Sequence, residues 1–290
     1  MKEQGGSHVR TTAAIIGAGG KMGARMTANV RNEADYEILC CEKSEEAAKR
    51  IGNEGLTVAP AAEAARRADI VVLAVPDRLI GTISRELVPF VKRGATVLLL
   101  DPAAACAGEL ELGEGINCVV AHPCHPPLFG EQTTDAARKD HFGGIAAWQD
   151  FVIALVKGDE RAVEEAEKFL KTAWKPVRRA HRVTLEQMAI LEPTMAEVVA
   201  ASAAVLMKEA LEEAVKAGVP RDAAESFMLG HAQIPLAIVF GAVSSPFSDA
   251  AKIAIAWGTE RVIRPDWRRV FEPGNVRAAI KAMLHPEKPR

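Results

Sequence analysis

The stretch Ala13-Ala14-Ile15-Ile16-Gly17-Ala18-Gly19-Gly20-Lys21-Met22-Gly23 decides the fold of this chain. Its first four residues have the character of a short buried strand, and the closely spaced glycines lead into a helical pattern. In a βαβ unit such a turn lets backbone N–H groups approach a pyrophosphate at the N-terminus of the helix. We therefore expect a dinucleotide to be bound by the turn residues Gly17, Gly19, Gly20, Lys21, Met22 and Gly23.

Glu42 supports this interpretation from the end of the next expected strand, Tyr36–Cys41. It follows Gly23 by about 20 residues, the spacing of the carboxylate that binds a ribose diol in these units. A carboxylate here repels a 2′-phosphate, so we expect NAD to be preferred over NADP, although Lys43 leaves some tolerance of NADP open. The simpler alternative is that Glu42 ends a strand on a solvated face.

The composition of the 290 residues excludes several classes of protein. A formal net charge of −2 argues against a basic surface for nucleic acid or for a membrane. The apolar runs are expected to have strand length, too short to span a bilayer. The 5 cysteines show no zinc-ligand spacing, and their odd number suits a reducing cytoplasm. Residues 1–12 are polar and predict a disordered lead-in rather than a signal peptide.

Further apolar runs alternate with helical stretches along the chain. The expected third to sixth strands are residues 68–75, 96–100, 117–121 and 151–156. Strands that are apolar on both faces predict a parallel sheet covered on both sides, so we assign residues 13–182 to an α/β domain with a Rossmann-type doubly wound sheet. Ligands of such sheets bind beyond the carboxyl ends of the strands. There Asp77 is expected to contact the cofactor, or else to cap the helix that it begins.

Residues 183–290 predict an all-α substrate domain. The sequence is helical from Thr184 to Ala217, and Pro193 is expected to stop or kink the helix at Glu192. The next helix has a largely apolar face made of Met195, Val198, Val199, Ser202, Val205 and Leu206. Because no strand is left to cover this surface, we expect a homodimer.

His122 and His125 stand at the end of the fifth expected strand, in a segment stiffened by three prolines. One interpretation is general acid or base catalysis on a substrate hydroxyl. Another is a divalent metal ion bound by His122, His125 and Glu192, with an open position for substrate. Glu192 is also a candidate catalytic base. The alternatives are that a histidine packs or caps the loop and that Glu192 is a solvated charge at a helix end.

His181 and His231 are weaker candidates, for which a half-buried structural role is the simpler interpretation. Several arginines are candidate clamps for a substrate carboxylate, because the guanidinium binds carboxylates in a bidentate manner. The sequence does not select among Arg178, Arg179, Arg182, Arg264, Arg268 and Arg269.

Several motifs together resemble the D-apionate oxidoisomerase family. They are the glycine turn, LDPAAA at 100–105, HPCHPPLF at 122–129, AHRVT at 180–184, EQMAILEP at 186–193 and PDW at 265–267. The resemblance implies a Rossmann domain followed by a 6-phosphogluconate-dehydrogenase-like helical domain. It also implies NAD as cofactor and a branched sugar acid as substrate, whose 2-hydroxyl is oxidised before a hydroxymethyl group migrates to give a 3-oxo product. That reaction resembles acetohydroxyacid isomeroreductase run backwards.

One departure from the wider dehydrogenase superfamily concerns its catalytic lysine, which an asparagine follows four residues later. Here Lys208 is followed at that spacing by Glu212, which argues against a lysine mechanism and shifts catalysis to His122, His125 and Glu192. Two other interpretations stay open. The chain is a plain NAD(P)-dependent 2- or 3-hydroxyacid dehydrogenase without isomerisation, or a nonenzymatic NAD-binding sensor.

Overall fold

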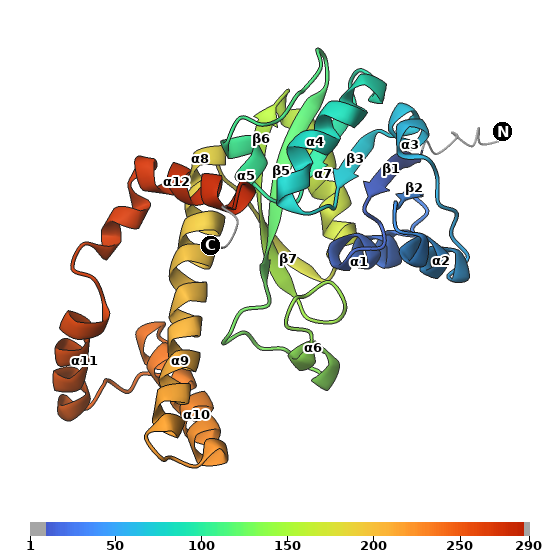
Figure 1. Ribbon diagram of the computed structural model, residues 1–290. Helices are drawn as coiled ribbons and strands as arrows, with labels where there is room; N and C mark the ends of the chain where they lie inside the picture. The colour runs from blue at the N-terminus through green and yellow to red at the C-terminus, as the bar shows by residue number, and fades with distance from the viewer. Residues whose placement is uncertain (1–9, 287–290) are drawn as a thin grey trace, which may run out of the picture. The chain divides into compact units, whose positions relative to one another are not determined.

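The computed structural model describes residues 10–286 and divides into two compact units (Figure 1). The first unit is Met1–Ala189 with Ile280–Arg290, and the second is Ile190–Ala279. We expected the helical domain to begin at residue 183, but the residues up to Ala189 stay with the first unit because a short helix there contacts the sheet. Residues 1–9 of the expected lead-in lie outside the described residues, and Thr11 and Thr12 already belong to the first strand.

Within residues 10–286, seven strands form one sheet in the first unit. They are β1 (Thr11–Ile16), β2 (Tyr36–Cys41), β3 (Ile70–Leu73), β4 (Thr96–Leu99), β5 (Asn117–His125), β6 (Gln149–Lys157) and β7 (Val177–Arg182). Their spatial order is β2-β1-β3-β4-β5-β6-β7. The first five are parallel, as expected, whereas β6 runs antiparallel to β5 and parallel to β7. The sequence did not predict β7, because its residues are mostly charged and exposed.

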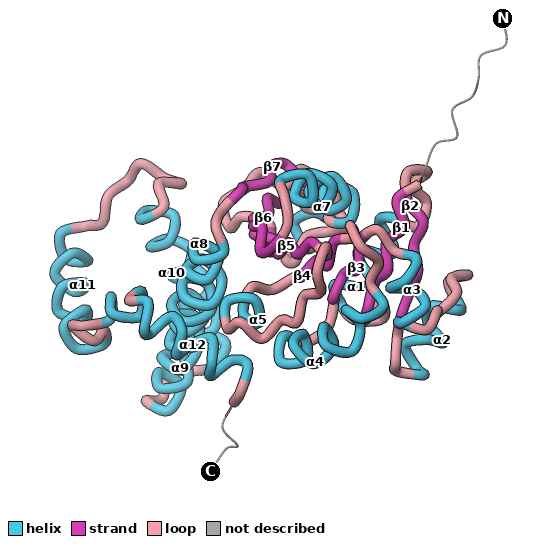
Figure 2. The backbone as a smooth tube through the Cα atoms, turned by 90° about the horizontal axis from the view of Figure 1, so that it is seen from above, coloured by secondary structure: helices cyan, strands magenta, loops and turns pink. Residues whose placement is uncertain are grey.

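Helices cover both faces of the sheet (Figure 2). In the first unit they are α1 (Lys21–Val30), α2 (Glu45–Asn53), α3 (Ala61–Arg67), α4 (Asp77–Leu87), η1 (Val88–Phe90), α5 (Ala103–Cys106), α6 (Asp135–Lys139), α7 (Glu160–Ala173) and α8 (Leu185–Ala189). Successive strand residues face opposite layers. Ala13 and Ile15 pack with α1 and α7, whereas Ala14 and Ile16 pack in the layer of α3, α4, α5 and α8. This alternation confirms the doubly wound arrangement.

The second unit is helical throughout its described residues. It contains the π-helix η2 (Ile190–Ala201), α9 (Ser202–Lys216), α10 (Arg221–Val239), α11 (Asp249–Val262), η3 (Trp267–Phe271) and the start of α12 (Pro273–Leu284). The helix was expected to stop or kink at Glu192, and it does not stop there, since α8, η2 and α9 follow one another without a break. Pro193 lacks a backbone N–H, and the wider π-helical turns accommodate the missing hydrogen bond.

This continuity also corrects the expectation that apolar runs have only strand length. The stretch Leu185–Lys216 is, by length and composition alone, long and apolar enough to cross a membrane. Only 17% of its most apolar window is buried within the structure. Most of that window is therefore exposed in the single chain.

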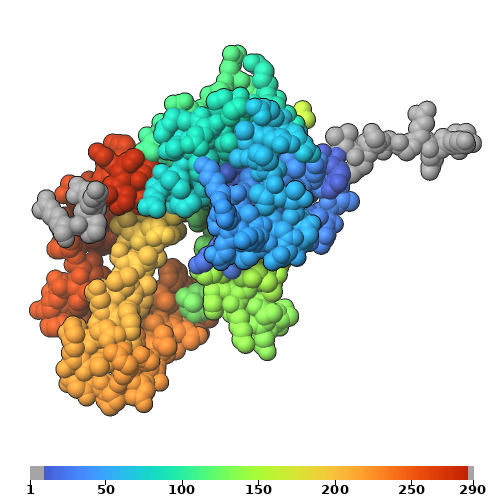
Figure 3. Space-filling view, turned by 45° about the vertical axis from the view of Figure 1, so that its right-hand side comes forward, coloured from blue at the N-terminus to red at the C-terminus, as the bar shows by residue number. Residues whose placement is uncertain are grey.

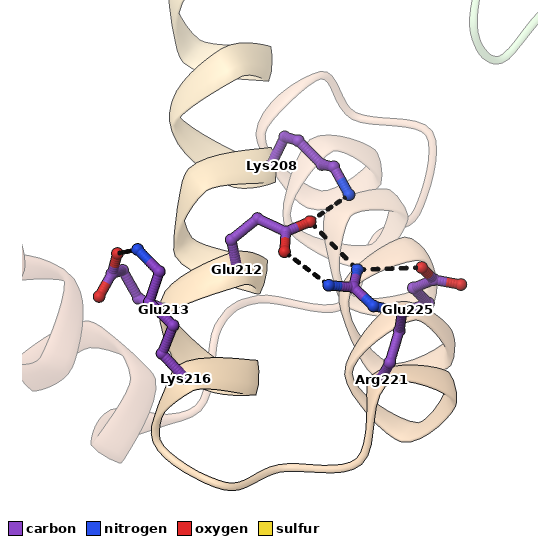
Figure 4. A network of polar contacts seen from close by, with 6 residues as sticks. All are labelled: Lys208, Glu212, Glu213, Lys216, Arg221 and Glu225. Carbon is purple, nitrogen blue, oxygen red and sulfur yellow. Dashed lines mark hydrogen bonds and ion pairs between the residues drawn. The ribbon is translucent and has the colours of Figure 1, made fainter.

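Lys208 lies in an ion-pair network that joins α9 to α10 (Figure 4). The carboxylate of Glu212 accepts hydrogen bonds from Arg221 Nη2 at 2.8 Å and from Lys208 Nζ at 2.6 Å. The bonds from Arg221 and Lys208 lower the pKa of Glu212 to about 2. Lys208 thus has an ion-pair partner on an exposed surface of the second unit.

Candidate active site

The glycine turn between β1 and α1 depends on two positions that cannot carry a side chain. Gly17 has φ +85°, and a Cβ there would lie 2.4 Å from the carbonyl oxygen of Ala74. A Cβ on Gly23 would lie 2.2 Å from the carbonyl oxygen of Gly17. The turn therefore leaves an open backbone cradle that ends at the N-cap Gly20 of α1. Such a cradle fits the pyrophosphate of a dinucleotide.

Glu42 is held in one orientation at the end of β2. Its Oε2 accepts the N–H of Gly19 at 2.9 Å, and its Oε1 accepts the N–H groups of Lys43 and Ser44, each at 2.9 Å. With the glycine turn it lines a cavity of about 650 Å³. The strand order reverses beside β1, and ligands of doubly wound sheets bind at such a reversal.

The remaining predicted cofactor residues lie at two helix starts. Lys21 and Met22 are the first two residues of α1, and Met22 packs on the core of the sheet. Asp77 begins α4 and is not among the described residues that line the 650 Å³ cavity. Its contact with the cofactor stays a prediction. The N-cap of α4 is Pro76 and not Asp77, which as an acidic residue of the first turn is favoured by the helix dipole.

His122 lies inside β5, which corrects the expected strand end at Ala121. The strand continues to His125 because β6 pairs with it over its whole second half. His122 Nδ1 lies 2.9 Å from the carbonyl oxygen of Leu100. A carbonyl only accepts, so Nδ1 carries the proton and Nε2 presents a lone pair. Burial lowers the pKa of His122 to about 4, which keeps this imidazole neutral and able to accept a proton or bind a metal ion.

His125 presents its ring in the same way. It occupies a bulge at the end of β5 with φ +61°, a conformation that is uncommon for residues other than glycine. Its Nδ1 lies 3.0 Å from the carbonyl oxygen of Phe142, so in the neutral form Nε2 again carries the lone pair. The two ring centroids are 6.0 Å apart. Carbonyl-anchored imidazoles of this kind are typical of metal ligands and serve equally well as bases.

Phe142 connects the histidine pair with the start of α1. Its ring centroid lies 5.9 Å from that of His125, 5.7 Å from Lys21 Nζ and 5.4 Å from the guanidinium of Arg25. One aromatic ring therefore spans the distance between the dinucleotide cradle and the histidines. Both groups lie at the same edge of the sheet, as the rule for strand ends predicts.

Glu192 belongs to the second compact unit, where it is 8% exposed. Within residues 10–286 no group of three His, Cys, Asp or Glu side chains is arranged to hold a metal ion. A ligand set of His122, His125 and Glu192 therefore stays a prediction.

Sequence reasoning missed a polar cluster beside the histidine pair. Asp150 on β6 pairs in register with His125, and its Oδ2 lies 3.0 Å from His181 Nε2 on β7. Its Oδ1 lies 3.5 Å from Arg178 Nε. The high density of charged side chains in β7 (VRRAHR) was the only sign of this cluster in the sequence. The side chain of His181 is 47% exposed, whereas His231 stacks on Phe227 in the second unit with ring centroids 3.8 Å apart.

The chain matches two family models, one for each part of the predicted architecture. Residues 9–127 match the acetohydroxy acid isomeroreductase NADPH-binding domain. Residues 130–284 match the phosphogluconate dehydrogenase (decarboxylating) C-terminal domain. These matches confirm a Rossmann-type domain followed by a 6-phosphogluconate-dehydrogenase-like domain.

Proteins of known name are similar over nearly the whole chain. A D-apionate oxidoisomerase from Rhizobium rhizogenes is 43% identical, over 93% of this chain and 98% of the relative. Another from Blautia hydrogenotrophica is 39% identical, over 97% and 99%. The crystal structure of a semialdehyde dehydrogenase NAD-binding protein from Cupriavidus necator, in complex with calcium and NAD, is 39% identical with a TM-score of 0.90. That match covers 95% of this chain and 100% of the other.

The geometry of Glu42 generates a prediction about cofactor choice. Glu42→Gln is expected to weaken NAD binding by about 1–3 kcal/mol, because a charge-assisted hydrogen bond to the ribose is lost. Isothermal titration calorimetry with NAD and with NADP measures the binding free energy of each cofactor. Glu46→Gln is the matched control, since Glu46 is an exposed residue of α2 outside the cavity lining. Equal affinity of the unchanged protein for both cofactors would contradict the assignment.

Proposed function

The chain belongs to the D-apionate oxidoisomerase family, and from this premise we propose that it is an NAD-dependent enzyme that oxidises and then rearranges a branched sugar acid. The observation that carries the proposal is the pair of imidazoles, each with Nδ1 on a backbone carbonyl, beside a cradle that fits a dinucleotide. The names of the relatives are names of enzymes, which leaves the sensor interpretation without support.

The proposed reaction moves protons at two oxygens of the substrate. In the oxidation, the 2-hydroxyl loses its proton and C2 loses a hydride, for which bound NAD supplies the acceptor. In the rearrangement, the 3-hydroxyl loses its proton and the hydroxymethyl group moves with its bonding electron pair from C3 to C2. The oxygen on C2 then gains a proton, and the oxo group ends at C3. A plain hydroxyacid dehydrogenase carries out the first part alone.

His122 is proposed as the base that takes the proton from the 2-hydroxyl. Its low pKa keeps Nε2 unprotonated at neutral pH, and the bond to Leu100 fixes the direction of the lone pair. His125, whose ring centroid lies 6.0 Å from that of His122, is proposed to handle the second oxygen through its own Nε2. Glu192, a catalytic candidate from the sequence alone, is proposed as the third catalytic side chain beside His122 and His125.

A divalent metal ion at the same place is the second candidate arrangement. The chemistry of the donors favours it, since two neutral imidazoles with anchored Nδ1 atoms are ready-made ligands. His122 and His125 would hold the ion with Glu192. There it would act as a Lewis acid toward the substrate oxygens. The similar protein from Cupriavidus necator was crystallised with calcium.

We also propose that a second copy of the chain covers the apolar helices of the second unit. Figure 3 shows α9 and α10 in yellow and orange at the surface. Large apolar side chains that are at least 45% exposed include Leu206, Phe227, Ile234, Phe240, Ile253 and Trp257. None of the described residues of α11 is buried. Few apolar side chains of the second unit are buried within one chain. A symmetric dimer would bury the exposed apolar surface of these helices.

The proposed site of action is the cytoplasm. All five cysteines, Cys40, Cys41, Cys106, Cys118 and Cys124, are free thiols, which fits a reducing compartment.

Removing the proposed base tests the function directly. His122→Ala is expected to lower kcat for D-apionate by about 10²–10⁴-fold with NAD affinity nearly unchanged, because a general base is lost while the cradle is kept. NADH formation measures turnover, and analysis of the product skeleton separates oxidation alone from oxidation with rearrangement. His231→Ala is the control. Near-normal turnover in both His122→Ala and His125→Ala would show that this segment is structural.

Removing a metal ion separates the two arrangements of the histidines. If the ion is required, a chelator abolishes turnover and added divalent cation restores it in the unchanged protein. His122→Ala, His125→Ala and Glu192→Gln should each need much more cation to recover any turnover. Full activity after exhaustive chelation would rule out the metal and leave the histidines as bases.

The assembly is tested by sedimentation of the protein without detergent. We expect twice the chain mass of 31.0 kDa. Ile253→Asp should shift the protein toward monomer, because Ile253 is 72% exposed on α11 and a buried charge in an interface is costly. Leu128→Asp is the matched control, a 68% exposed apolar residue of the first unit. A monomeric unchanged protein, or one that stays in solution only with detergent, would overturn the proposal.

A further inference from the structure

A second polar group lies on the sheet beside the histidine pair, and the proposed chemistry does not use it. It is built from Trp148, which precedes β6, from Asp150 at the start of β6, and from Arg178 and His181 of β7. The guanidinium of Arg178 lies over the ring of Trp148, 4.1 Å from its centroid. Asp150, with a side chain 15% exposed, lies between Arg178 and His181. Arg178 is thus held on two sides while its own side chain stays 53% exposed.

The register of the sheet places this cluster on the same face as His122. Val152 pairs with His122 on one side and with His181 on the other. Arg182, the neighbour of His181, binds Glu167 of α7, which marks the opposite face. Successive residues alternate, so His181 shares the face of His122. Neighbouring strands lie about 4.8 Å apart, which puts β7 about 10 Å from β5, a distance that a small sugar acid bridges with its hydrogen bonds.

The structure also separates Arg178 from four of the other five candidate arginines. Arg182 is occupied by Glu167 at 3.0 Å and by Glu160. Arg264 and Arg269 of the second unit pair with Asp266 at 3.2 and 3.9 Å. Arg268 lies over its own neighbour Trp267.

Only one edge of the Arg178 guanidinium is occupied by its described neighbours. Asp150 contacts Nε, and the indole covers a face, so Nη1 and Nη2 are left as a fork of donors. Such a fork matches the two oxygens of a carboxylate. His181 holds the other oxygen of Asp150 and therefore keeps that carboxylate on the Nε side.

We propose that Arg178 binds the carboxylate of the sugar acid, and that Asp150, His181 and Trp148 position its guanidinium. The inference rests on the proposed function and adds to it the residue that recognises the acid group. It assigns the histidine pair to the hydroxyl end of the substrate and β7 to the carboxylate end.

Steady-state kinetics of Arg178→Gln with D-apionate test the assignment. KM for D-apionate is expected to rise about 10–100-fold, while kcat stays within a few-fold and KM for NAD is unchanged, because a binding contact is lost rather than a reacting group. Arg178→Lys should recover only part of the loss, since it keeps the charge without the fork. Asp150→Asn should raise KM in the same direction and less strongly.

Arg179→Gln is the matched control, an exposed arginine from the next position of the same strand. The carboxamide of D-apionate is the matched substrate, and its KM should not respond to Arg178→Gln. An unchanged KM for the acid in Arg178→Gln, an equal rise for the carboxamide, or an equal rise in Arg179→Gln would overturn the inference.

Failure of the proposed function is distinguishable from failure of this subsite. If the unchanged protein forms no NADH from D-apionate, the proposed function has failed. Calorimetric titration with erythronate, a linear sugar acid, then still tests Arg178. Weaker binding to Arg178→Gln than to Arg179→Gln supports the carboxylate subsite, and equal binding to both contradicts it.

Discussion

The close contact between the glycine turn and the end of β3 is the constraint on which the rest of the site depends. A Cβ at Gly17 would lie 2.4 Å from the carbonyl oxygen of Ala74, so a side chain there would force the turn away from the sheet. A Cβ at Gly23 would lie 2.2 Å from the carbonyl oxygen of Gly17 and would force α1 away from the turn. Movement of the turn would also break the bond from Gly19 to Glu42, which fixes the carboxylate at the end of β2. The glycine turn and the carboxylate proposed to bind the ribose are therefore coupled through the bond from Gly19 to Glu42.

The antiparallel strand β6 fixes the positions of His122 and His125, as the glycine turn fixes the backbone of the dinucleotide cradle. Pairing with β6 extends β5 through His125, so both histidines belong to the carboxyl-terminal part of a paired strand and not to a free loop. Backbone carbonyls of Leu100 and Phe142 then set the tautomer of each ring. Groups built on strands and oriented by neighbouring backbone are held more precisely than groups on loops, which suits proton transfer at defined oxygens.

Strands β1 to β4, the glycine turn and the place of Glu42 after β2 could be predicted from the sequence, because each depends on residues that are close in sequence. Features that depend on contacts between distant residues could not be predicted. The extension of β5 and the existence of β7 depend on pairing with β6, and β7 itself lacks the apolar pattern of a buried strand. Pro193 predicted a stop or a kink, and π-helical turns continue the helix past it without a stop. Selecting Arg178 required knowing that Asp150 and Trp148 lie beside it, which only the folded sheet determines.

The separation of the two polar groups has an electrostatic reason. His122 stays neutral because burial lowers its pKa to about 4, and a bound carboxylate directly beside it would raise that pKa by favouring the protonated ring. Arg178 is about half exposed, so its charge is solvated and costs little to keep. In the proposed binding mode, an acid group two strands away, against a permanent cation, would keep its charge in contact with solvent. The proposed hydroxyl chemistry would then take place at His122, which burial keeps unprotonated.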